Sequence, residues 1–237
     1  MKRFFLPAIM KYGILFISLL FSLTLRAQAD VVPDQDQRYR EDQFYLGVTY
    51  NLLLDLPQRV SQNGLSYGLQ SGFIRDFPLN QACTFAIGVG LGYSFNSYYT
   101  NLRAIEDGSD IRYEILDGTV DYKRNKLETH IIELPVEIRW RNSTRTDYKF
   151  WRIYGGFKLG YIVGTRSKFV TKDFVDSFYN SDSENFRYGL MLNVGYNTFN
   201  LHLYYGLNSL FEDGVTISDG QSLEMAPLHL GLIFYIL

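Results

Sequence analysis

Eight segments of this chain alternate between apolar residues and small or polar residues at every second position. The segment 85–96 is the clearest, because Phe, Ile, Val, Leu, Tyr and Phe interleave with Ala, Gly, Ser and Asn. A period of two is that of a β-strand with two unlike faces. The pattern predicts an all-β fold built from segments 44–52, 67–73, 85–96, 131–140, 151–164, 186–196, 199–208 and 228–237.

The apolar face of all eight segments contains no Lys, Arg, Asp or Glu. Most segments are long enough to cross a bilayer, since a tilted strand needs about 9–11 residues. Aromatic residues stand near segment ends, as at Phe44, Tyr93, Trp140 and Trp151, and resemble the interfacial girdles of membrane barrels. We predict an eight-stranded antiparallel up-and-down transmembrane β-barrel over residues 43–237.

The second face decides between this barrel and a soluble alternative. A soluble sandwich or lipocalin also alternates with period two, but its solvent face favours Lys, Glu and Thr. Here the second face consists of Gly, Ala, Ser and Asn with a few charges. Small residues suit the interior of a narrow barrel that side chains fill, so the sequence favours the outer-membrane barrel.

The N-terminal residues have the pattern of an export signal. Three cations, Lys2, Arg3 and Lys11, precede the apolar stretch 13–25, and small residues follow at Ala27 and Ala29. A stretch of 13 residues is too short for a spanning helix, which needs about 20. We expect residues 1–29 to be a signal peptide cleaved after Ala27 or Ala29, and residues 30–42 to be a periplasmic lead.

Composition excludes several classes of protein. The 237 residues are 46% hydrophobic with a net charge of -2, which argues against a disordered chain and against a basic nucleic-acid binder. The lone Cys83 cannot form an internal disulfide or a cysteine-rich zinc site. No cofactor, metal site, nucleic acid or small-molecule substrate is expected.

Connection lengths alternate and predict the orientation of the barrel. Short connections lie at 76–81, 141–147 and 197–198, and long ones at 54–64, 100–126, 166–183 and 210–222. Outer-membrane barrels keep short turns in the periplasm and long loops outside. We therefore expect both termini to be periplasmic and the long loops to be extracellular.

The longest connection carries a hairpin signal. Apolar residues alternate over 111–115 and again over 120–122, on either side of Asp117 and Gly118, a dipeptide that favours a two-residue turn. We expect a hairpin there that extends the barrel wall. The charges of this loop are mixed in sign and predict no lipopolysaccharide-specific patch.

Charged residues on the small-residue face would point into the lumen. Opposite charges there should pair, because an unpaired buried ion is costly. They could form a polar plug or gate, or they could simply fill and fix the barrel; the second reading is favoured. The expected network is Glu133, Glu137, Arg139, Arg152, Lys158 and Arg187.

The loop after the fifth segment contains four aromatic residues among Asp and Ser. They are Phe169, Phe174, Phe178 and Tyr179. The cluster is either a partner-binding surface or a loop that packs on itself.

Catalytic residues are scarce. We expect His130 on the lipid-facing side, whereas His202 and His229 should point into the lumen, so the three do not converge. Ser94 and His130 lie on adjacent segments but on opposite faces, which disfavours a serine–histidine pair. The sequence therefore predicts a protein that is not an enzyme, and a lipid-modifying enzyme is the less favoured alternative.

Four stretches resemble the PorT family of Gram-negative outer-membrane barrels: 72–80, 87–94, 133–140 and 154–161. The most particular is the turn Arg75-Asp76-Phe77-Pro78-Leu79-Asn80. The resemblance implies an accessory role in type IX secretion, the export of proteins with a C-terminal signal domain, with other secretion-system proteins and outer-membrane lipid as partners. It brings no catalytic residues. The alternative is a stand-alone structural or adhesion barrel of OmpX type.

Overall fold

The computed structural model describes residues 42–108, 110–142, 150–197 and 199–236. The expected signal peptide, and all of the expected lead except Asp42, lie outside these residues. The described part contains no helix long and apolar enough to cross a membrane. Its strands are β1 (Gln43–Leu54), β2 (Tyr67–Pro78), β3 (Phe85–Tyr99), β4 (Leu102–Asp107), β5 (Asp110–Ile115), β6 (Arg124–Arg141), β7 (Trp151–Val170), β8 (Val175–Tyr179), β9 (Phe186–Tyr196), β10 (Phe199–Gly206) and β11 (Ala226–Ile236).

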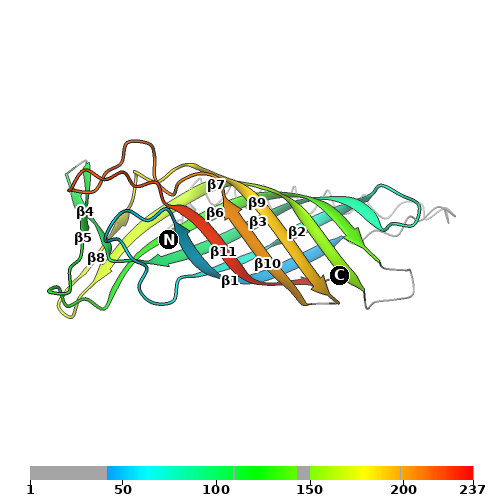
Figure 1. Cartoon of the computed structure of the whole chain (residues 1–237), viewed down its shortest axis with the longest axis horizontal. Coiled ribbons are helices and arrows are strands. Elements are labelled where there is room, and N and C mark those ends of the chain that lie inside the picture. The colour runs from blue at the N-terminus through cyan, green and yellow to red at the C-terminus, as the bar shows by residue number, and fades with distance from the viewer. Residues whose placement is uncertain (1–41, 109, 143–149, 198, 237) are drawn as a thin grey trace, which may run out of the picture. The chain divides into compact units, whose positions relative to one another are not determined.

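Eight strands form one closed antiparallel barrel. Their order is β1-β2-β3-β6-β7-β9-β10-β11, and β11 pairs back onto β1 to complete the ring. Figure 1 shows these strands running obliquely, with β4, β5 and β8 gathered at one end. The predicted eight-stranded antiparallel barrel is confirmed.

Side chains alternate between the outside of the barrel and its lumen. On β6, Leu134 is 43% exposed while its neighbour Glu133 is 7% exposed. The same alternation runs along β1, where Tyr45 is buried and Leu46 is exposed. Apolar residues and many aromatic rings therefore cover the outside, and polar residues pack within together with tyrosines such as Tyr45, Tyr154 and Tyr235.

The barrel has two unlike ends. The connections 55–66, 100–123, 171–185 and 207–225, which include β4, β5 and β8, lie at what we call the long-loop end. The other, short-turn end carries the connection 79–84 and the turns from β6 to β7 and from β9 to β10. Residues 143–149 and 198 of those two turns lie outside the described part.

The predicted hairpin at Asp117 and Gly118 is wrong. β5 pairs backward with β4, with Tyr113 opposite Ala104, and the tight turn is at Gly108, whose φ is +69°. Glycine tolerates such a backbone conformation. The wall is extended instead by β6 and β7, which have 18 and 20 residues, and by β8 paired to the end of β7.

Candidate functional site

A charged layer fills the lumen near the short-turn end. The Nε of Arg139 donates to Glu137 Oε2 at 2.9 Å, and its Nη1 lies 3.1 Å from Asp76 Oδ1. Arg141 Nη2 lies 2.9 Å from the other oxygen of Asp76. All four side chains are buried. Since buried charges are tolerated when they are paired, the four hold one another in place.

Gly88 on β3 makes room for this layer. It lies between Asp76 on β2 and Glu137 on β6 in the strand register. A Cβ at Gly88 would lie 2.6 Å from Arg139 Nε. The guanidinium can therefore cross over β3 and reach Asp76 because position 88 has no side chain.

A second polar layer lies deeper in the lumen. Lys158 Nζ is 2.9 Å from Glu133 Oε2 and donates to Gln70 Oε1 at 2.9 Å. Ser94 Oγ donates to Glu133 Oε1 at 2.7 Å. These contacts join β2, β3, β6 and β7 across the interior.

Arg152 and Arg187 make other contacts. The guanidinium carbon of Arg152 lies 4.5 Å from the ring centroid of Phe150, a cation–π contact. Arg187 Nη1 donates to the carbonyl of Asn208 at 3.2 Å. The six charges singled out in the sequence therefore divide among several contacts along the lumen.

Sequence reasoning missed Asp76 and Arg141, which join the paired charges to β2. The short connection was expected to begin at Asp76, but β2 continues to Pro78. The alternation of the strands could have identified both residues, because every second residue shares a face. Asp76 lies two residues after buried Ile74, and Arg141 lies two residues after Arg139.

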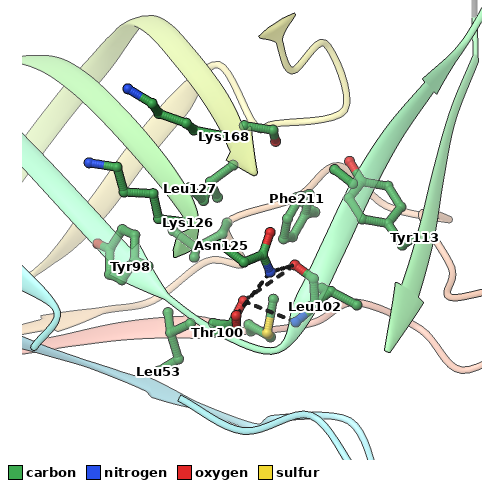
Figure 2. Close-up of a pocket in the computed structure, with 14 residues that line it drawn as sticks. Leu53, Tyr98, Thr100, Leu102, Tyr113, Asn125, Lys126, Leu127, Lys168 and Phe211 are labelled. Carbon is green, nitrogen blue, oxygen red and sulfur yellow. Dashed lines mark hydrogen bonds between the residues drawn. The ribbon is translucent and has the colours of Figure 1, made fainter. Parts of the chain in front are cut away.

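The long-loop end is closed by a cluster of buried apolar side chains that we call the cap. It draws on β1, β3, β4, β5 and the connections from β1 to β2 and from β10 to β11. Within it lies a cavity of about 20 Å³ (Figure 2), room for about one water molecule. The cap consists of Leu53, Val60, Tyr98, Leu102, Ala104, Tyr113, Leu210, Phe211, Ile217, Leu223 and Met225.

Hydrogen bonds fix the β4–β5 hairpin in the cap. Asn125 Nδ2 donates to the carbonyls of Thr100 and Leu102 at 2.9 and 2.7 Å (Figure 2). The hydroxyl of Tyr113 donates to Asn180 Oδ1 at 3.1 Å. Burial raises the pKa of the Tyr113 phenol above its ordinary value, so Tyr113 is neutral in the closed cap.

The four aromatic residues of the possible partner loop do not form one surface. Phe169 is 3% exposed and lies under the guanidinium of Arg103, and Phe178 packs against the cap. Phe174 and Tyr179 are 50% and 77% exposed. The structure therefore divides the set into two residues that pack inward and two that face outward.

Each of the three histidines has a different hydrogen-bond partner. His202 Nδ1 is 2.6 Å from Asn193 Oδ1, and His229 Nε2 is 2.8 Å from the Tyr98 hydroxyl. His130 contacts Tyr93 on the outside, whereas Ser94 is buried. Ser94 and His130 therefore stand on opposite faces of the wall. No group of three His, Cys, Asp or Glu among the described residues is placed to hold a metal ion.

Comparison with known proteins identifies the fold family. The family model of the outer membrane protein beta-barrel domain matches residues 27–212. No curated protein matches the chain. The chain is similar to the solved structure of Ail, the attachment invasion locus protein of Yersinia pestis, with 13% identity, a TM-score of 0.38, and coverage of 82% of this chain and 97% of that one.

Two further solved structures match. One is the same Ail protein in complex with the heparin analogue sucrose octasulfate, with 13% identity, a TM-score of 0.34, and coverage of 83% and 99%. The other is a mutant porin of Rh. blastica, with 10% identity, a TM-score of 0.15, and coverage of 84% and 100%. The family assignment rests on the family model, which covers more than half of the chain. The chain belongs to the outer membrane protein beta-barrel domain family.

Proposed function

We propose that this outer-membrane barrel is a non-enzymatic accessory component of type IX secretion, and that it acts through contacts at its loops or turns. The observation that carries the proposal is the filling of the lumen. The layer around Asp76 occupies the short-turn end, and the cap occupies the long-loop end. An eight-stranded barrel has little interior space to begin with, so a role as the export conduit is disfavoured.

The segments that resemble the PorT family support this proposal. The turn segment 75–80 provides Asp76, and the segment 133–140 provides Glu137 and Arg139. The most particular stretch of the resemblance thus provides one member of the charged layer, Asp76, and the segment 133–140, which is shared by a broader group of small barrels, provides two of the others. In the orientation we propose, with both termini periplasmic and the long loops extracellular, this layer lies on the periplasmic side.

We propose that the chain has three parts, each with its own task in this role. Residues 1–29 would direct export and be removed, residues 30–42 would form a periplasmic lead, and residues 43–237 would form the barrel. The partners would be outer-membrane lipid and other proteins of the secretion system.

The test is the extracellular proteome of a deletion strain, compared with its parent and with the deletion strain carrying the gene on a plasmid. In the deletion strain, we expect proteins with type IX C-terminal signal domains to be depleted from the medium and to accumulate in the periplasm. Complementation should restore them to the medium. Exported proteins without such domains serve as the internal control. An unchanged secretome would overturn the secretion role.

The second candidate is a structural or adhesion barrel of OmpX type. The exposure of Phe174, Val175 and Tyr179 on and beside β8, at 50%, 63% and 77%, favours it. This reading predicts an unchanged secretome together with reduced attachment to surfaces or cells. Variant F174S/Y179S should then lose attachment, and variant V120S, at another exposed loop position, should keep it.

A further inference from the structure

The ends of β6 and β7 that extend the barrel wall, residues 124–128 and 166–170, carry a cluster of positive charge on the face turned away from the cap. On β6, Asn125 and Thr129 are buried, and Arg124, Lys126 and Glu128 lie on the opposite face, where Arg124 is exposed and the side chains of Lys126 and Glu128 are only 8% and 16% exposed. In the register, Lys126 lies opposite Lys168 on β7, and Glu128 lies opposite Arg166. Directly opposed residues share a face of the sheet. This face therefore carries four cations and one acid, with Arg124 and Arg166 exposed and Lys168 partly exposed; we call Arg124, Lys126, Arg166 and Lys168 the basic face.

Most of this charge is uncompensated. Lys126 forms an ion pair with Glu128, and Arg166 Nε donates to the Ser177 hydroxyl at 2.7 Å. Among the described residues, no ion pair joins Arg124, Arg166 or Lys168 to a carboxylate. Figure 2 shows the amines of Lys126 and Lys168 side by side, both pointing away from the cavity. Like charges directly opposite one another destabilise a sheet, and Glu128 compensates only Lys126 of the opposed pair Lys126 and Lys168, so an anion beside Lys168 would offset the remaining repulsion.

The basic face continues the membrane-facing surface of the barrel. On β6 the outward positions run from Leu134 and Ile132 through His130 to Lys126. His130 packs on Phe95, with ring centroids 5.1 Å apart, and Phe95 lies 6.0 Å from Tyr67. Such aromatic rings mark the boundary between hydrocarbon and headgroups. The cations therefore lie just beyond the hydrocarbon, at the level of the lipid headgroups.

A groove beside the basic face suits an amphipathic ligand. Leu65, which is 68% exposed, and three tyrosines offer it an apolar side, and Lys123 and Arg124 offer it positive charge. The Lys126 ammonium lies 5.5 Å from the Tyr99 ring centroid at the same level. The tyrosines of the groove are Tyr67, Tyr99 and Tyr122.

We propose that the basic face binds the phosphate groups of anionic lipids in the leaflet that surrounds the long-loop end. Arg124 and Lys168 contact phosphate, and the upper part of the acyl chains lies against Leu65 and the tyrosines of the groove. Lipid is favoured over a protein partner because the face is continuous with the lipid-covered wall. This arrangement is not evident from the loop sequence, in which cations and acids are mixed along the chain. The pairing of β6 with β7 brings the cations onto one face of the sheet. The proposal does not depend on the secretion role.

The test measures lipid bound to the purified full-length protein in neutral detergent. Phosphatidylglycerol and phosphatidylcholine are titrated separately, and native mass spectrometry counts the lipids retained. The wild type should retain phosphatidylglycerol in preference to phosphatidylcholine, and added salt should weaken the binding. Variant R124Q/K168Q should bind phosphatidylglycerol roughly tenfold more weakly, since each cation near a lipid surface contributes appreciably.

Two further variants complete the design. R59Q/R112Q removes two exposed cations elsewhere on the loops, Arg112 being 65% exposed and paired with Asp107, and it should bind as the wild type does. R124K/K168R keeps the charge and should also bind normally. Equal retention of the two lipids by the wild type, unchanged binding by R124Q/K168Q, or an equal loss in R59Q/R112Q would overturn the proposal. Heat-modifiable gel mobility reports that each variant is folded.

Discussion

Arg139 on β6 reaches over Gly88 to Asp76 on β2, with Nη1 and Oδ1 3.1 Å apart and both side chains fully buried. The pair joins strands that are not neighbours in the barrel. Arg141 contacts the other oxygen of Asp76. One carboxylate therefore forms ion pairs with two guanidinium groups. Removing it would take one charged partner from each of two buried cations.

Variant D76N should therefore destabilise the barrel. Loss of one partner of a buried ion pair costs about 3–5 kcal/mol, and we expect a lower midpoint in urea unfolding followed by heat-modifiable gel mobility. Variant D121N is the control, because Asp121 pairs with Lys172 at the surface, where their side chains are 74% and 70% exposed. Equal midpoints for the two variants would show that the buried layer contributes little.

Variant L134R should destabilise the barrel through the lipid. Leu134 faces outward on β6 opposite Leu159, and an arginine on the lipid face costs about 2–4 kcal/mol near the midplane. Y179R, at a 77% exposed position on β8, should unfold like the wild type. The measurement is urea unfolding in lipid vesicles, and a wild-type midpoint for L134R would contradict the assigned facing.

Neighbouring glycines on β7 provide a matched pair. A Cβ at Gly156 would collide with the Val136 carbonyl, whereas one at Gly155 would lie 3.9 Å from Leu192 Cδ1, an ordinary contact. Overpacking costs about 1–3 kcal/mol. Variant G156A should lower the unfolding midpoint clearly more than G155A does, and the reverse order would refute the packing described for this wall.

The cap should weaken at alkaline pH. Burial holds the pKa of Tyr113 above its ordinary value of 10.0, so the closed cap keeps the phenol neutral while an opened cap allows it to ionise. This contribution is complete below pH 10 and declines as the pH rises above 10. Limited proteolysis of the β4–β5 hairpin should accelerate between pH 9 and pH 11 in the wild type.

Variant Y113F isolates this effect, because phenylalanine does not ionise. Its cleavage should be faster at pH 9, since the hydrogen bond to Asn180 is lost, but the acceleration between pH 9 and pH 11 should be smaller. Variant Y179F, at an exposed position, should accelerate like the wild type. Equal acceleration in Y113F and in the wild type would exclude Tyr113 as the source.

The barrel strands could be predicted because one property, alternation, is imposed on every strand by the membrane outside and the filled lumen inside. The β4–β5 hairpin has no such two-sided environment. Its residues Leu102, Ala104 and Tyr113 are buried in a cap assembled from distant loops. Local sequence therefore favours a turn at the Asp117-Gly118 dipeptide, whereas contacts with the cap place the turn at Gly108.

The lumen charges were identifiable for the same reason, but their partners were not. Parity places Glu137 and Arg139 inside, yet it does not say that Arg139 would pass over Gly88 to Asp76, two strands away. Likewise, cations that look mixed with acids along the loop sequence meet as Lys126 and Lys168 once β6 and β7 are paired. Contacts across strands depend on register, which alternation alone does not fix.

The proposed accessory role requires a closed lumen. Measuring the ion conductance of the barrel tests most directly whether the lumen is closed. The purified full-length barrel is inserted into a planar bilayer and the current is recorded at steady voltage. Because the charged layer and the cap fill the two ends of the lumen, we predict no stable conductance steps, while a general porin inserted in the same way conducts. Reproducible open steps from the wild-type barrel would contradict the closed lumen and reopen a role as a conduit.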